Sequence, residues 1–228
     1  MKNPWLRIPS SDYEARMALP EVAQAQALSK LMASALKEYP PASLAVIGCT
    51  AGNGFEHIDP TNTRRVVGVD INAAYLAVLK TRFAGKIPHL ELIEADVTAP
   101  CFGFDPVAMV FAALVFEYVD AASALRSIAR CLAPGAILVA VLQLPSPESA
   151  PVTVSRYKSL ELLAPIMNLV SPSEFLTCAI VSDFNKSKRI RSHSKRERHS
   201  LSVSIEGTPN PAHQRKRTSR AAELGVNQ

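Results

Sequence analysis

The chain has 228 residues, of which 48% are hydrophobic, and it carries a formal net charge of +5. This length and composition are typical of a globular protein with one sizeable core. No stretch reaches the ~18 uninterrupted apolar residues that a membrane span requires, so we expect no membrane partner. The four cysteines are scattered without a Cys-x-x-Cys pair, which argues against a structural zinc site and against a disulfide framework. A reducing, cytoplasmic location is therefore the simplest expectation.

Residues 1–42 combine a polar, proline-containing lead with a predicted helix over Pro20–Glu38. Proline suits the first position of a helix, and the apolar residues that follow recur at helical spacing along one face. The helix is expected to stop before Pro40, because proline restricts the residue that precedes it.

The most informative segment, residues 43–54, is an apolar run that ends in three glycines, Gly48, Gly52 and Gly54. A continuous Val/Ile/Leu run is typical of a buried parallel strand, and glycines directly after it allow a tight turn and close approach of a ligand. A second apolar run, Val66–Asp70, ends in a carboxylate that can accept hydrogen bonds from both hydroxyls of a ribose. Together the two runs predict a pocket for a nucleotide-like ligand.

The glycine spacing distinguishes two ligand classes. A dinucleotide-binding turn requires Gly-x-Gly-x-x-Gly, whereas the loop over residues 48–54 has glycine at its first, fifth and seventh positions. This loop resembles the glycine loop of class I S-adenosylmethionine-dependent methyltransferases, where the first, third, fifth and seventh positions are usually glycine. The chain departs from that pattern at Thr50, which replaces the middle glycine, and at Val46, where the family often has an acid that holds the methionine amino group.

Further features follow in the order that this family shows. Leu90–Ile93 is a predicted third strand, and the segment after it contains Asp96 and Val97, at positions where the family contacts adenine. Val107–Phe116 is a predicted fourth strand with its exit toward the site. The remaining predicted elements are a helix over Ala121–Leu132, a Leu-Ala-Pro-Gly-Ala turn similar to one in the family, and a fifth strand over Ile137–Leu142.

The resemblance implies a fold class and a cofactor. It implies a three-layer, Rossmann-like α/β domain over residues 43–184 with a mostly parallel sheet, and S-adenosylmethionine as the cofactor. The residues that it places against the cofactor are Gly48, Cys49, Gly52 and Gly54 on the methionine side, Asp70 at the ribose, Ile71, Asp96 and Val97 at the adenine, and Ala113 near the sulfonium.

Residues that contact the acceptor are harder to identify. Methyl transfer from a sulfonium needs no covalent enzyme intermediate, and a general base is required only for an acceptor that is protonated at working pH, so no catalytic residue is assigned. Glu117 and Tyr118 follow the fourth strand, near the place where acceptors usually lie, although Glu117 also fits a solvated loop acid. The leading segment Ile8–Glu14 is expected to fold over the pocket, which makes Tyr13 either an acceptor contact or, like Trp5, an aromatic anchor of the terminus.

The basic charge is concentrated in residues 185–228. Residues 185–220 contain eleven Lys or Arg and two Glu, whereas residues 1–184 contain 14 basic and 17 acidic side chains. The shortage of apolar residues favours disorder in this basic tail, with Leu201–Ile205 as the one alternating run that fits a short strand. The sheet is then expected to lack its final pair of strands, for which a shifted reading frame is one hypothetical explanation.

These features favour a methyltransferase that acts on a small-molecule acceptor, because no insert for recognising a larger substrate is visible in the α/β domain. Two alternatives remain open, namely a nucleic-acid methyltransferase guided by the basic tail and a nucleoside-binding protein without catalytic activity. A nicotinamide-dependent dehydrogenase fits the glycine spacing less well. The sequence predicts no oligomeric state.

Overall fold

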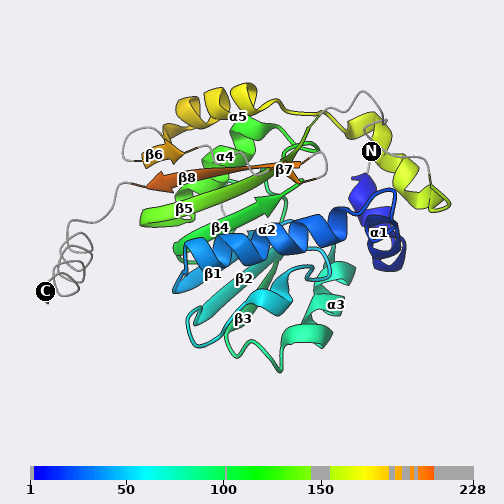
Figure 1. Cartoon of the computed structure of the whole chain (residues 1–228), viewed down its shortest axis with the longest axis horizontal. Helices are drawn as coiled ribbons and strands as arrows, with labels where there is room; N and C mark the ends of the chain where they lie inside the picture. The colour runs from blue at the N-terminus through cyan, green and yellow to red at the C-terminus, as the bar shows by residue number, and fades with distance from the viewer. Residues whose placement is uncertain are drawn as a thin grey trace, which may run out of the picture.

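The computed structural model describes residues 3–100, 102–144, 155–184, 188–191, 196–197 and 200–207, with side chains described up to Ser182. Within these ranges a central sheet is covered by helices on both faces (Figure 1). The strands are β1 (Ser43–Ile47), β2 (Arg65–Asp70), β3 (Leu90–Glu94), β4 (Val107–Ala113), β5 (Leu132–Gln143), β6 (Lys188–Arg191), β7 (Arg196–Glu197) and β8 (Ser200–Gly207).

The sheet has the strand order β3-β2-β1-β4-β5-β8-β6, and β7 pairs with β8. Strands β1 to β5 pair in parallel, so their carboxyl ends meet at one edge. At that edge Ile47 of β1 pairs with Val69 on one side and with Ala112 on the other. The strand order reverses between β1 and β4, which is where ligands bind in open α/β sheets. The expected mostly parallel, Rossmann-like α/β fold is therefore confirmed.

Helices cover the two faces in separate groups, with α2 and α3 on one face and α4 and α5 on the other (Figure 1). Side chains of β1 alternate between the two layers, since Leu44 and Val46 pack with α2 whereas Ala45 and Ile47 pack with α4. The helical segments are η1 (Pro4–Arg7), α1 (Ser10–Met17), α2 (Gln24–Glu38), η2 (Phe55–His57), α3 (Ala73–Phe83), α4 (Ala121–Arg130), η3 (Lys158–Ile166), α5 (Pro172–Ala179) and η4 (Ile180–Phe184).

Several boundaries differ from the sequence predictions, and β4 ends at Ala113 instead of Phe116. Helix α2 begins at Gln24 instead of Pro20, because α1 ends at Met17 and the chain turns before it re-enters helix, with Ala23 left-handed at φ 46°. The Pro-Gly turn predicted before the fifth strand lies inside β5, since Leu132 already pairs with Val107 before the register shifts.

The C-terminal prediction also needs correction. Strand β8 pairs antiparallel with β5 from Ile137 opposite Glu206 to Gln143 opposite Ser200, and β6 pairs with β8. The expectation that the sheet lacks its final strands is therefore wrong, and the shifted-frame hypothesis loses the observation on which it rests. The short strand predicted over Leu201–Ile205 is confirmed within β8. The predicted disorder of the tail is wrong for β6, β7 and β8, and the other tail residues, 208–228 included, lie outside the described residues.

No helix in the described part of the chain is long and apolar enough to cross a membrane.

Candidate active site

A cleft of about 660 Å³ lies at the carboxyl ends of β1, β2 and β4, at the reversal of strand order. Eight residues predicted to contact cofactor or acceptor line it, namely Tyr13, Gly48, Asp70, Ile71, Asp96, Val97, Ala113 and Tyr118.

Asp70 is fixed at the end of β2 by the backbone around it. Its Oδ2 accepts a hydrogen bond from the Thr50 amide at 2.8 Å, and its Oδ1 accepts one from the Asn72 amide at 2.9 Å. The side chain is only 7% exposed, and this burial raises its pKa, while the backbone bonds act in the opposite direction. A carboxylate has about four acceptor positions, so these bonds orient Asp70 and leave capacity for a ligand.

The loop after β1 is held in a conformation that suits glycine. Gly48 has φ 67° and donates its amide to the Val69 carbonyl at 2.8 Å, and a Cβ on it would lie 2.6 Å from Cγ2 of Val115. Thr50, in place of the family's middle glycine, is also left-handed at φ 46°, although its side chain is branched at Cβ. Leu114 at the end of β4 has φ 53° and lines the same cleft. Backbone strain is therefore concentrated around the cleft, as is common at ligand sites.

Another part of the cleft lining suits a ligand with a flat, apolar ring and a polar edge. Ile71 and Val97 line it, and Val97 is buried in the core beneath. Asp96 holds its position through Oδ1, which accepts hydrogen bonds from the Thr98 amide at 2.8 Å and from the Thr98 hydroxyl at 2.7 Å.

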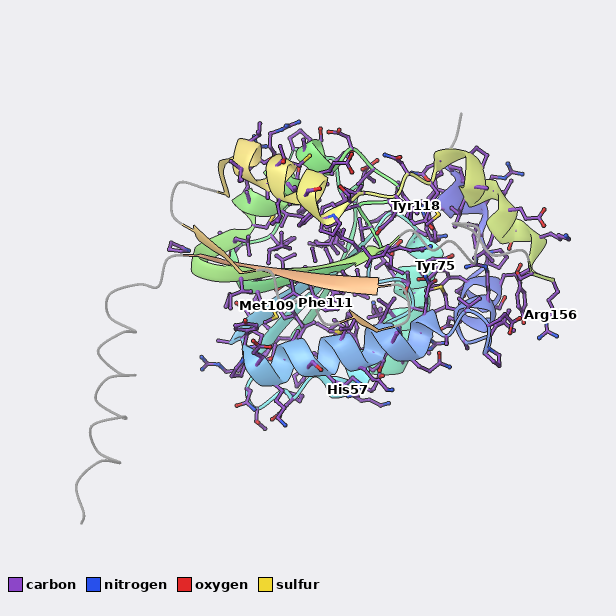
Figure 2. All side chains as sticks on the ribbon, turned by 45° about the horizontal axis from the view of Figure 1, so that its top comes forward. His57, Tyr75, Met109, Phe111, Tyr118 and Arg156 are labelled. Atoms are coloured by element: carbon purple, nitrogen blue, oxygen red, sulfur yellow. The ribbon has the colours of Figure 1, made fainter. Side chains whose placement is uncertain are left out.

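Aromatic residues of the N-terminal segment close the cleft. The ring of Trp5 makes edge contacts with the rings of Tyr118, at 5.0 Å between centroids, and Tyr13, at 5.7 Å. Tyr118 and Tyr75 lie together at the end of the sheet beside α1, whereas His57 lies next to α2 (Figure 2). Burial raises the pKa of both Tyr13 and Tyr118, so their hydroxyls stay protonated at neutral pH and do not act as bases.

Hydrogen bonds and an ion pair attach the N-terminal segment to the rest of the domain and hold its aromatic residues at the cleft. Asn72 donates its side-chain amide to the Trp5 carbonyl at 2.9 Å. Glu14 of α1 pairs with Arg82 of α3, and Asp12 accepts a hydrogen bond from the Ser159 hydroxyl at 2.6 Å. The structure places Trp5 and Tyr13 of this segment in the lining of the cleft.

Four predicted site residues do not line the cleft. The thiol of Cys49 packs in the core, where burial raises its pKa. Gly52 and Gly54 lie against the helices, since a Cβ on them would be 2.8 Å from the Phe83 ring and 2.7 Å from the Met32 sulfur. Glu117 is buried away from the cleft and accepts a hydrogen bond at Oε1 from the Gln143 amide at 2.6 Å.

Other lining residues were missed by sequence reasoning. Leu114 and Val115 lie within the predicted exit of the fourth strand, and their apolar character alone gave no signal for the direction in which each points. Asn3 and Val119 carried no signal at all. Val46, at the position where the family often has an acid, packs toward α2 in the core and does not line the cleft.

Comparison with known proteins agrees with this geometry. Residues 45–140 match the family model described as "Methyltransferase domain". No curated protein matches the chain in sequence.

Solved structures share the fold at low sequence identity. A possible exported protein from Bordetella parapertussis aligns with TM-score 0.63 and 16% identity, over 84% of this chain and 70% of that one. An S-adenosylmethionine-dependent methyltransferase from Mesorhizobium loti aligns with TM-score 0.56 and 18% identity, over 76% and 96%. Human N-acetylserotonin methyltransferase, solved with S-adenosylmethionine, aligns with TM-score 0.57 and 13% identity, over 81% and 55%.

The glycine loop, the strand order and the cleft at its reversal agree with the family match. Residues 45–140 thus match a methyltransferase-domain model in sequence, and the chain shares its fold with solved S-adenosylmethionine-dependent methyltransferases.

Proposed function

We propose that this protein is an S-adenosylmethionine-dependent methyltransferase that acts on a small-molecule acceptor, in a reducing cytoplasmic setting. The observation that supports this best is Asp70, a buried carboxylate at the carboxyl end of β2. Two backbone amides hold it, and it lines the cleft. The family match supplies the reaction class, since a nucleotide-like pocket alone does not identify a reaction.

The residues present fit the cofactor. Asp70 would hold the ribose hydroxyls, Ile71 and Val97 would cover the two sides of the adenine ring, and Asp96 would accept its exocyclic amine. The Gly48 backbone would adjoin the methionine portion, because Gly48 lines the cleft and carries no side chain of its own. No carboxylate stands at Val46, so the methionine amino group would depend on backbone carbonyls at the cleft.

S-Adenosylmethionine supplies a methyl group on a sulfonium, and in transfer the acceptor's lone pair forms the new bond while sulfur retains the electron pair of the broken C–S bond. The protein's contribution is to orient the acceptor and exclude water, which the closure by Trp5, Tyr13 and Tyr118 provides. Among the described residues that line the cleft, the only carboxylates are Asp70 and Asp96, both on the adenosine side. The arrangement therefore suits an acceptor that is already deprotonated or that releases its proton to water.

Native mass spectrometry of the purified protein tests this proposal. We expect S-adenosylmethionine, or its demethylated product, to remain bound at one molecule per chain. Co-purification of a nicotinamide dinucleotide instead would overturn it. Incubation with radiolabelled S-adenosylmethionine and fractions of small metabolites or of RNA would then separate a small-molecule enzyme, a nucleic-acid enzyme and a binder without activity.

A further inference from the structure

Elements η1 and α1 pack with η3 beyond the carboxyl ends of the strands, and we call these three elements the lid (Figure 1). The lid has a small apolar cluster of its own, in which Ile8, Leu160 and Leu163 are buried. This cluster is separate from the two large clusters on the faces of the sheet, into one of which Met17 packs at the end of α1. Units with few buried apolar contacts to the core open at lower free energy than the core itself. The lid is therefore anchored at Met17 and is otherwise a candidate for opening.

The chain between α1 and α2 gives the lid a place to turn. Helix α1 ends at Met17 and α2 begins at Gln24. Ala23, between them, is left-handed at φ 46°, and no side chain caps the first turn of α2. Hinges are commonly a few residues at the ends of elements, where the backbone angles can change. Residues 18–23 thus connect the lid to α2 through a break in the helix.

A buried hydroxyl beneath the lid opposes closure. Tyr75 of α3 packs against Tyr13 of α1, with 6.0 Å between the ring centroids, and is only 1% exposed (Figure 2). Its hydroxyl makes no hydrogen bond with any residue that the structure describes. Burial of a hydroxyl without a partner costs free energy that contact with water recovers. The closed lid therefore needs a compensating interaction.

Asn72 connects the lid to the carboxylate that is expected to hold the ribose. Its backbone amide donates to Oδ1 of Asp70 at 2.9 Å, and its side-chain amide donates to the Trp5 carbonyl at 2.9 Å. Its own Oδ1 accepts a hydrogen bond from the Ala74 amide at 3.0 Å, which caps α3. One residue, only 6% exposed, thus contacts both the ligand-facing carboxylate and the backbone of the lid.

We propose that Asn72 is a positioning residue that couples occupancy of the cleft to closure of the lid. The ligand-free protein exchanges between this closed arrangement and an open one, and bound S-adenosylmethionine holds the lid closed. Asp70 and the lid residues Trp5 and Tyr13 line the same cleft, so a ligand that touches all three binds the closed arrangement more tightly. Closure then excludes water from the acceptor end. This inference rests on the proposed function, because it assigns the cleft to the cofactor.

Fluorescence of Trp5, the only tryptophan of the chain, reports on the lid without a label. Acrylamide quenching is measured with and without saturating S-adenosylhomocysteine, and calorimetry on the same samples establishes that the ligand is bound. We expect the ligand to lower the quenching constant of the wild type by about a factor of two or more, because closure withdraws Trp5 from solvent. An unchanged quenching constant in protein that binds the ligand overturns the proposal.

Asn72→Ser separates the coupling from the capping of α3. Serine caps a helix about as well as asparagine, but its side chain is too short to reach the Trp5 carbonyl. We expect the variant to bind S-adenosylhomocysteine roughly three- to tenfold more weakly, and Trp5 to respond little at saturation. Asn62→Ser is the matched control, since Asn62 is exposed at the opposite end of β2, and it should behave as the wild type does. If Asn72→Ser shows the full wild-type response, the ligand shields Trp5 directly and the coupling through Asn72 is contradicted.

Tyr75→Phe should have the opposite effect, because it keeps the ring beneath Tyr13 and removes the hydroxyl. Its ligand-free form is expected to be quenched less than the wild type, and to bind S-adenosylhomocysteine roughly three- to tenfold more tightly. Loss of a purely structural contact would give no gain in affinity. Equal quenching and equal affinity in the two proteins contradict an opening that hydrates this hydroxyl.

Cofactor binding separates this inference from the proposed function. If the wild type binds S-adenosylhomocysteine and Trp5 responds only where Asn72 is intact, both stand. If the wild type binds it without a response of Trp5, this inference fails alone. If the wild type binds neither S-adenosylhomocysteine nor S-adenosylmethionine, the proposed function fails first. Where Asn72→Ser does not fold, the wild type and Tyr75→Phe decide.

Discussion

Strand β2 ends in a carboxylate and the turn after β4 carries another at the same edge of the sheet, and the environments of these two side chains differ. Asp70 directly ends β2, lines the cleft and is oriented by the amides of Thr50 and Asn72. Glu117 follows the left-handed turn at Leu114, which directs Val115 and Tyr118 to the cleft and Glu117 into the interior. An acid near the end of a strand is therefore a candidate ligand contact only when the local backbone directs its side chain toward the cleft.

The largest expected effect concerns Glu117, which is 1% exposed and whose Oε2 makes no hydrogen bond with the described part of the chain. Burial raises the pKa of Glu117 from 4.5 to about 7. A raised folded-state pKa means that its contribution to stability is full below pH 4.5 and is lost as the pH rises through 7. At ~1.4 kcal/mol per pKa unit, the loss is about 3 kcal/mol.

Urea unfolding of the wild type and of Glu117→Gln between pH 4.5 and pH 8 measures this. The wild type should lose about 3 kcal/mol relative to the variant over that interval, because the variant cannot ionise. Parallel pH profiles for the two proteins would show that Glu117 does not titrate in this range. The environments of Glu117 and Asp70 would then differ less than the burial of Glu117 indicates.

Asp70→Ala should remove most of the affinity for S-adenosylmethionine. Loss of a carboxylate that accepts two ribose hydroxyls is expected to cost about 2–3 kcal/mol, or roughly 30- to 100-fold in the dissociation constant. Calorimetric titration measures it, with Glu94→Ala as the matched control, since Glu94 ends the neighbouring strand β3, is exposed and does not line the cleft. Similar losses in both variants would indicate a general electrostatic effect.

A smaller effect tests the packing role of Gly54. Gly54→Ala should destabilise the fold by about 1–2 kcal/mol, because φ is 91° there and the new Cβ would meet the Met32 sulfur at 2.7 Å. Gly85→Ala is the control, since nothing lies within 4 Å of a Cβ there, and it should leave thermal stability unchanged or slightly raise it. Equal melting temperatures for the two variants would contradict the packing role.

The smallest effect is a gain. Thr50→Gly should raise stability by up to about 1 kcal/mol, since relief of the left-handed strain at φ 46° exceeds the entropy lost by a freer backbone. Thr81→Gly, on the exposed side of α3, should instead lower stability by a similar amount, because glycine weakens a helix interior. If both substitutions destabilise the protein, the conformation of Thr50 is not strained.

The sequence predicted those parts of the site that depend on strand ends. Apolar runs define β1, β2 and β4, and their carboxyl ends bring Gly48, Asp70 and Ala113 together. It did not predict the direction of side chains after β4, because that depends on one left-handed residue in an apolar run.

At the C-terminus the structure contains strands that the sequence composition did not predict. Composition favours disorder from residue 185 onward, yet β8 pairs along β5 because the existing strand edge offers a row of backbone donors and acceptors. Backbone pairing of this kind depends little on side-chain composition, so a basic segment gave little indication of it beyond the alternating run at Leu201–Ile205.

The central claim is that the cleft at the ends of β1, β2 and β4 binds S-adenosylmethionine. Isothermal titration of the purified wild-type protein with S-adenosylmethionine, and in parallel with NAD, tests it most directly. We predict saturable binding of one S-adenosylmethionine per chain and no binding of NAD. Saturable binding of NAD with no heat from S-adenosylmethionine, or no binding of either ligand, would contradict the account.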